Sequence, residues 1–156
     1  MPLSESIVDV FMRPIRDADA YILYADIGRN YIDFTYPRAI NVGISETTMV
    51  GMACGLASEG HKVYTFCLTP HILRAWEFVR TILVPKKYNV VVCGGGSGED
   101  YASLGHSQQM PPQEMVLYCR ASGIRYIKPH DRADLDGALR QHGPLFLHIP
   151  NSVREK

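Results

Sequence analysis

The sequence has no run of about 20 apolar residues, the length that a membrane-spanning helix requires, and no apolar signal segment in residues 1–16. It also lacks an excess of charge of either sign, because 16 lysine and arginine residues balance 16 aspartate and glutamate residues. Balanced charge gives no long-range attraction to nucleic acid or to an anionic membrane. We therefore expect a cytoplasmic protein that binds neither nucleic acid nor a membrane.

Cysteine pairs at metal-binding spacing are also missing. The four cysteines are widely separated and form no CxxC pair: Cys54, Cys67, Cys93 and Cys119. Their neighbours are apolar, which is typical of small buried side chains rather than zinc ligands or a disulfide framework. We expect free, buried thiols and no metal ligands in this chain.

Apolar segments of strand length alternate with amphipathic segments of helix length. The predicted strands are Tyr21–Ala25, Ala39–Val42, Lys62–Cys67, Asn89–Cys93, Arg125–Lys128 and Leu145–Ile149. The predicted helices are Glu46–Glu59, Ile72–Val84, Gln113–Ala121 and Arg132–Gln141, with a short first helix, Glu5–Met12, stopped by Pro14. Short strands that are apolar on both faces are typical of sheets covered on both sides. The sequence therefore predicts one α/β domain over residues 1–156, a three-layer α/β/α fold with a mostly parallel, six-stranded sheet.

A carboxylate stands where the second predicted strand turns into a helix. Ser45 is a plausible N-cap of the helix that begins at Glu46, and Gly60 lies just past its end. Ligands of open α/β sheets bind outside the carboxyl ends of the strands, so Glu46 lies where a ligand is expected. The alternative is that an acidic residue in the first turn only stabilises the helix dipole.

A glycine-rich segment, Val92–Asp100, follows the fourth predicted strand. It lacks the Gly-Lys-Ser/Thr ending of a phosphate-binding loop, and no clear helix begins after it. We interpret it as a loop whose backbone approaches a ligand closely, or alternatively as a flexible surface loop. A nucleotide-binding flavodoxin-like domain is a further alternative that rests on this segment alone.

Two histidines also follow strands. His71 comes after Lys62–Cys67, and His106 comes after the glycine-rich segment. Because the carboxyl ends of parallel strands share one edge, we expect both to converge with Glu46, although each alone is more typical of a structural histidine. The other four are expected in loops or on the surface: His61, His130, His142 and His148.

The run from Tyr36 to Gly60 resembles the pyrimidine-binding domain of transketolase and deoxyxylulose-phosphate synthase. It has Pro-Arg before a strand, then Gly-Ile-Ser-Glu, then a small-residue helix ending in Cys-Gly-Leu-Ala-Ser-Glu-Gly. Later segments are similar to the same family, so that the resemblance extends from about Ala25 to Pro150: His71–Arg80, Gly95–His106, Ile127–Asp131 and Gly143–Leu147.

This resemblance implies that the chain binds thiamine diphosphate with Mg²⁺. Glu46 matches the family glutamate that hydrogen-bonds the aminopyrimidine ring nitrogen and favours its imino tautomer, and Ile44 just before it is expected to contact the cofactor. His71 stands where the family has an aromatic residue stacked on the ring, so nearby Phe66 or Trp76 is expected to compensate.

His106 matches a family histidine that faces the substrate and can move protons. The correspondence is looser there, because the segment from Asp100 to His106 is longer than its counterpart in the family. Three arginines are candidates to bind a phosphorylated sugar, or are simply solvated surface charges: Arg29, Arg38 and Arg74.

The family's metal-diphosphate motif, Gly-Asp-Gly followed by Asn-Asn, is absent from the sequence, and so is the third domain of transketolase. The resemblance therefore implies a separate diphosphate-binding subunit that supplies the Mg²⁺ ligands, in an α2β2 heterotetramer. The helix Glu46–Glu59 is small or apolar nearly all round, which favours burial on more than one side and a place at that interface.

The function implied is that of a split transketolase-like transferase, active only with its partner. It would make or break a C–C bond next to a ketone, through a carbanion-enamine on the cofactor. The substrate would be a keto-sugar or a 2-keto acid. Two alternatives stay open: a subunit of a thiamine diphosphate-dependent decarboxylase or acyloin synthase, and a degenerate, non-catalytic pyrimidine-domain module.

Overall fold

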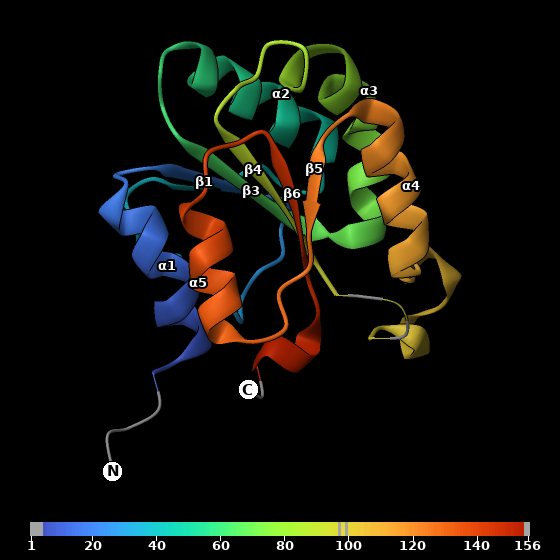
Figure 1. Ribbon diagram of the computed structural model, residues 1–156. Helices are drawn as coiled ribbons and strands as arrows, with labels where there is room; N and C mark the ends of the chain where they lie inside the picture. The colour runs from blue at the N-terminus through green and yellow to red at the C-terminus, as the bar shows by residue number, and fades with distance from the viewer. Residues whose placement is uncertain (1–4, 97, 99, 155–156) are drawn as a thin grey trace.

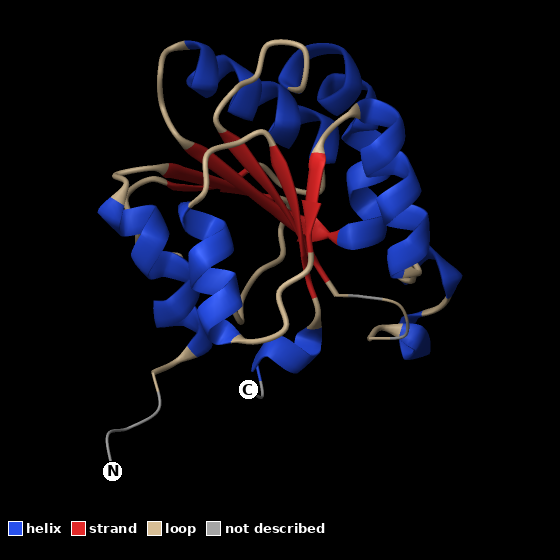
Figure 2. Ribbon diagram, in the orientation of Figure 1, coloured by secondary structure: helices blue, strands red, loops and turns tan. Residues whose placement is uncertain are grey.

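Six strands form a single sheet between two layers of helices (Figures 1 and 2). The computed structural model describes residues 5–96, 98 and 100–154. The strands are β1 (Tyr21–Tyr24), β2 (Ala39–Asn41), β3 (Val63–Leu68), β4 (Val90–Gly95), β5 (Arg125–Ile127) and β6 (Leu145–Ile149). Their order is β2-β1-β3-β4-β6-β5, and every pairing is parallel. The predicted three-layer α/β/α fold is confirmed, with a sheet that is wholly rather than mostly parallel.

Helices cover both faces of this sheet (Figure 1). One face packs against α1 (Ile7–Asp17) and α5 (Arg132–Arg140), and the other against α2 (Glu46–Ser58), α3 (Trp76–Phe78) and α4 (Pro112–Ser122). Shorter 3₁₀ turns are η1 (Thr69–Ala75), η3 (Ala102–Leu104), η4 (His106–Gln108) and η5 (Asn151–Arg154), and η2 (Val79–Leu83) is a π-helical turn. Strands β3, β4 and β6 are buried along their whole length, as the covering of both faces requires. No described helix is long and apolar enough to cross a membrane.

Helix α1 continues through Pro14, so the predicted helix Glu5–Met12 with a stop at this proline is wrong. A proline inside a helix costs about 3 kcal/mol, because it removes a hydrogen bond and crowds the preceding turn. The helix nevertheless buries Phe11 and Ile15 completely, one on each side of the proline. Burying such side chains stabilises a fold by about 1.5–3 kcal/mol each, which outweighs the cost of Pro14.

The predicted helix Ile72–Val84 is also wrong as a single regular helix. The segment winds as the 3₁₀ turn η1, one turn of α3 and the π-helical turn η2. Side chains three residues apart eclipse each other in a 3₁₀ turn, so Ile72 and Ala75 both point into the core. His71 and Arg74 share the same spacing on the other side of that turn.

All four cysteines are free and buried, as predicted: Cys54, Cys67, Cys93 and Cys119. Burial raises the pKa of the Cys54 thiol to about 11 and that of Cys119 to about 12. These thiols are therefore protonated at neutral pH and pack as small apolar side chains.

The glycines that end β4 make room for neighbouring side chains of the same chain. A β-carbon on Gly94 would collide with Phe146 and with the hydroxyl of Thr69. Gly96 has a positive φ of 78°, and a β-carbon there would enter the ring of Tyr101. Packing within the chain thus explains these glycines without a ligand. Ser97 and Glu99 of the same segment lie outside the described residues.

The carbonyl of Gly96 anchors this segment. It accepts hydrogen bonds from Thr69 Oγ1 at 2.7 Å and from His148 Nε2 at 2.9 Å, and the hydroxyl of Tyr126 donates to Nδ1 of the same ring at 2.8 Å. His148 is fully buried in β6, so its predicted place in a loop or on the surface is wrong. Burial lowers the pKa of His148 to about 4, against a smaller opposite effect of the Gly96 carbonyl.

Replacing Gly96 by alanine should destabilise the fold by about 1–3 kcal/mol, through the positive φ and the clash with Tyr101. Urea denaturation measures the change. Gly137→Ala is the matched control, because an added β-carbon there meets nothing within 4 Å in helix α5. That variant should gain about 0.4–1 kcal/mol. Equal stability of Gly96→Ala and the wild type would contradict the assigned packing.

Stability should fall as the pH drops from about 6.5, the ordinary pKa of histidine, toward the lowered pKa of His148, about 4. The unfolded chain binds the proton more readily, so protonation favours unfolding, and up to about 3 kcal/mol is lost over this window. His71, whose pKa is also lowered, adds to the loss in the same direction. Denaturation midpoints across this range should decline less steeply in His148→Gln. The exposed His142→Gln should follow the wild-type curve, and an unchanged slope in His148→Gln would refute the burial of a neutral ring.

Candidate functional site

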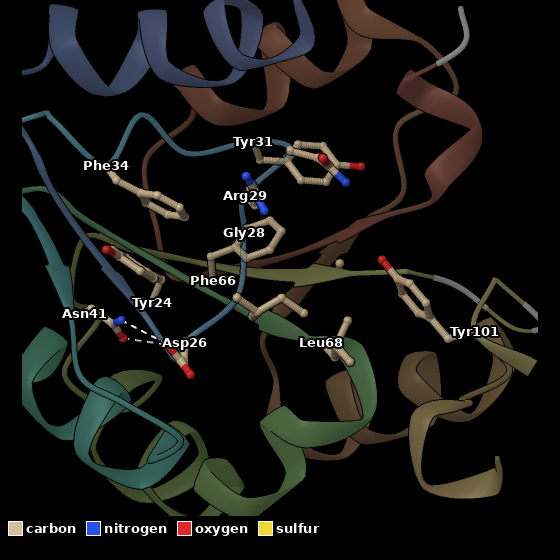
Figure 3. Close-up of a pocket in the computed structure, with 13 residues that line it drawn as sticks. Tyr24, Asp26, Gly28, Arg29, Tyr31, Phe34, Asn41, Phe66, Leu68 and Tyr101 are labelled. Atoms are coloured by element: carbon tan, nitrogen blue, oxygen red, sulfur yellow. Dashed lines mark hydrogen bonds between the residues drawn. The ribbon is translucent and has the colours of Figure 1, made fainter. Parts of the chain in front are cut away.

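The connections that follow β1 and β3 leave the sheet on opposite faces. After β1 the chain packs Tyr31 into the core on the α1–α5 face, whereas after β3 it packs Ile72 on the α2 face. Such a divergence is a topological switch point, where ligands of open α/β sheets bind. A pocket of about 470 Å³ opens there, between the carboxyl ends of the two strands (Figure 3).

The walls of this pocket are largely aromatic. Tyr24 and Phe34 stack with their ring centroids 5.0 Å apart, and the rings of Tyr31 and Phe66 are 5.2 Å apart. The polar side chains that line the pocket are Asp26, Arg29, Asn30, Asn41 and Tyr101. A pocket of this kind suits a small ligand that carries polar or charged groups.

Asn41 connects the pocket with the turn that leads to helix α2. Its Nδ2 donates to Asp26 Oδ1 at 3.1 Å, and its Oδ1 accepts from the backbone N–H of Asp26 at 3.2 Å (Figure 3). The same Oδ1 also accepts from the backbone N–H of Gly43 at 2.9 Å. Asp26 has a φ of 51°, a conformation that aspartate tolerates better than most residues. Asp26 was not predicted as a site residue, although this residue follows a strand at the same edge of the sheet as Glu46.

Glu46 begins α2 and is only 3% exposed. Its Oε1 accepts a hydrogen bond from Arg74 Nη1 at 2.9 Å and lies 3.5 Å from His71 Nδ1. Ser45 is the N-cap residue of α2, as predicted, but its side chain makes no capping bond; its hydroxyl donates instead to Thr48 Oγ1 at 2.6 Å. A buried carboxylate needs a partner, and η1 supplies it with both Arg74 and His71.

The His71 ring is held neutral beside this carboxylate. Burial lowers its pKa most, the charge of Arg74 lowers it further, and Glu46 opposes both. Gln108 and Ser107 lie near the ring and raise the pKa slightly. Neither makes a hydrogen bond of good geometry with Nε2, which is buried without a partner among the described residues. The ring is therefore uncharged, with Nδ1 on the side of Glu46 and Nε2 without a partner in the described part of the chain.

The structure brings Glu46 and His71 together but places the other predicted residues differently. His106 is exposed in η4, the turn whose next residues lie beside His71. Ile44 is 77% exposed, two residues before Glu46. Phe66 packs with the core on the α1–α5 face and lines the aromatic pocket, on the opposite face of the sheet from α2. Trp76 is packed edge-on against Tyr118 and Phe146.

No group of three or more His, Cys, Asp or Glu side chains is arranged to hold a metal ion in residues 5–96, 98 and 100–154. The chemistry available at this edge is therefore that of one buried carboxylate, one neutral imidazole and an adjoining pocket that contains an arginine.

Residues 24–147 match the family described as the pyrimidine binding domain of transketolase. A relative named as a transketolase C-terminal section, from Methanocaldococcus jannaschii, is 28% identical over 123 residues, which cover 76% of this chain and 39% of the relative. One of the subunits of an apulose-4-phosphate transketolase, from Actinobacillus succinogenes, is 30% identical over 118 residues, which cover 72% of this chain and 37% of the relative.

The SqwH subunit of a 6-deoxy-6-sulfo-D-fructose transketolase, from Clostridium sp. strain MSTE9, is 26% identical over 84% of this chain and 42% of its own. The chain thus spans about two fifths of the length of the curated relatives it matches.

Solved structures share the fold. A split-gene transketolase, described as an inactive β4 tetramer, superposes with a TM-score of 0.70 at 22% identity, over 90% of this chain and 49% of that one. A transketolase from Pichia stipitis superposes with a TM-score of 0.72 at 15% identity, over 93% of this chain and 25% of that one.

Proposed function

The chain belongs to the family of transketolase pyrimidine-binding domains, and we propose that it is the pyrimidine-binding subunit of a split, thiamine diphosphate-dependent transketolase-like enzyme. The observation that carries this proposal is the buried Glu46 carboxylate at the start of α2, at the sheet edge where ligands bind. The relatives named as transketolase subunits or sections support the split arrangement.

The residues around Glu46 fit the aminopyrimidine half of thiamine diphosphate. The Glu46 carboxylate holds or gives up a proton at a ring nitrogen, while the neutral His71 ring offers a flat face in place of the usual aromatic residue. The exposed side chain of Ile44 provides an apolar contact beside them. The cofactor, when bound, supplies the electron sink for cleaving a bond next to a ketone. His106, exposed on the adjoining turn, moves a proton to or from the substrate.

A partner subunit completes the site in this proposal. It binds the diphosphate and supplies the Mg²⁺ ligands, and two copies of each chain form an α2β2 heterotetramer. The outward side of α2 supports a docking role, because Met52 is 39% exposed and Gly55 has nothing within 4 Å of its β position. Such an apolar, small-residue surface allows close approach of another chain.

We further propose that the substrate carries an anionic group, which Arg29 binds. Two of the three candidate arginines have acidic partners: Arg38 pairs with Asp19 at 2.7 Å, and Arg74 with Glu46. Arg29 lines the aromatic pocket and, within the described part of the chain, makes no ion pair. The names of two relatives specify a sulfonated and a phosphorylated sugar. A keto-sugar phosphate or sulfonate, or a 2-keto acid, meets this requirement.

In the assembled complex, Glu46→Gln should lower turnover by about 100-fold or more, since proton transfer by a positioned side chain contributes about 10²–10⁴-fold. Steady-state kinetics measures the loss, and calorimetric titration of thiamine diphosphate with Mg²⁺ tests binding. The chain alone should not bind the cofactor, whereas the mixture with its partner should.

Glu77→Gln is the matched control, because Glu77 is an exposed carboxylate paired with Arg80. It should leave turnover unchanged. Full turnover by the Glu46→Gln complex would remove Glu46 from the reaction, and tight Mg²⁺-dependent binding by this chain alone would overturn the split site.

Arg29→Gln should raise the KM for phosphorylated or sulfonated donors by about 10–100-fold, the equivalent of one charge-assisted contact of about 1.5–3 kcal/mol. The kcat and the KM for uncharged keto-sugars should change little, which a panel of paired donors measures. Arg38→Gln, which removes an arginine outside the pocket, serves as control. An equal loss for charged and uncharged donors would contradict the assignment of Arg29 to an anionic group.

A further inference from the structure

Arg74 forms an ion pair with Glu46, the carboxylate on which the proposed function depends. Its Nη1 lies 2.9 Å from Glu46 Oε1, the oxygen that also faces His71. The Arg74 side chain is 53% exposed, whereas that of Glu46 is 4% exposed. One end of this ion pair is therefore fixed inside the protein, and the other reaches in from the surface.

This ion pair opposes the chemistry proposed for Glu46. The Arg74 guanidinium donates a charge-assisted hydrogen bond to Oε1, so a ring nitrogen that is to bind at this oxygen has to replace it. Opening Oε1 to an aminopyrimidine therefore requires the Arg74 side chain to move away.

The surroundings of Arg74 allow the side chain to move while its backbone stays fixed. Thr47 Oγ1 donates to the Arg74 carbonyl at 3.0 Å and so ties η1 to α2. The next acidic residue along the chain, Glu77, already accepts two hydrogen bonds from Arg80, at 2.8 and 3.0 Å. Glu77 is thus already paired, and a carboxylate from another chain is a suitable new partner for Arg74.

We propose that Arg74 is a latch that keeps Glu46 closed until the diphosphate-binding subunit docks and offers Arg74 a carboxylate. The proposed docking surface includes the exposed side chains of Ile44 and Arg74 beside Glu46, and that of Met52 farther along α2. It fits a partner surface that is apolar with an acidic group near its centre. This inference rests on the proposed role of Glu46.

The test uses the isolated chain and 4-amino-2,5-dimethylpyrimidine, the aminopyrimidine half of the cofactor alone, followed by NMR titration. Removing the latch in Arg74→Gln should tighten binding about tenfold or more, because a site open about a tenth of the time binds about tenfold more weakly. Arg74→Met retains the apolar stem of the side chain and is the second variant if Arg74→Gln does not fold. Arg80→Gln, which removes a neighbouring exposed arginine, should bind as the wild type does.

Adding Glu46→Gln to either Arg74 variant should abolish the gain, since the ring then has no carboxylate to bind. Equal binding by the wild type and the Arg74 variants, or binding by neither, overturns the latch. The two proposals fail separately. Full turnover by the Glu46→Gln complex removes the proposed role of Glu46, whereas loss of turnover there without tighter binding by the Arg74 variants removes the latch alone.

Discussion

A carboxylate buried at the start of α2 has to be neutralised by its own chain, and the local structure of this edge follows from that need. Glu46 is 3% exposed, and its two neighbours of complementary chemistry both come from η1. His71 and Arg74 are three residues apart, a spacing at which side chains are eclipsed in a 3₁₀ turn and so are more closely aligned than in an α-helix. The 3₁₀ winding after β3 thus aligns an imidazole and a guanidinium toward one carboxylate, while Ile72 and Ala75 stay in the core.

The parallel sheet brings a second region to the same edge. The aromatic pocket lies between the ends of β1 and β3, and Asn41 joins it to the turn before Glu46 through Asp26 and Gly43. Asp26 and Gly43 are thus both hydrogen-bonded to one amide side chain. In the proposed function this shared support fixes the position of the pocket relative to the turn that leads to Glu46.

The apolar runs of the sequence predicted each strand to within one or two residues. Because parallel strands share one carboxyl edge, the sequence also predicted that Glu46 and His71 lie close together. It did not predict the continuation of α1 through Pro14, where tertiary burial outweighs local preference. One error was avoidable. His148 lies inside a fully buried strand, and only its polarity suggested the surface. Hydrophobic periodicity did not predict that η1 is a 3₁₀ turn. Its polar contacts are with distant residues: Thr69 bonds the Gly96 carbonyl, and Arg74 bonds Glu46.

The energy needed to open Glu46 is within reach of subunit docking. A site that is open about a tenth of the time is held closed by about 1.4 kcal/mol. At about 25 cal/mol per Å² of apolar surface, burying roughly 60 Å² offsets that cost. The exposed side chains of Ile44 and Met52 on this chain, with matching surface on a partner, are of that scale. A partner carboxylate that pairs with Arg74 lowers the free-energy cost of opening further. An aminopyrimidine that replaces Arg74 at Glu46 offsets the remaining cost. In this proposal docking, opening and cofactor binding are one coupled step, and without its partner the chain keeps Glu46 paired with Arg74.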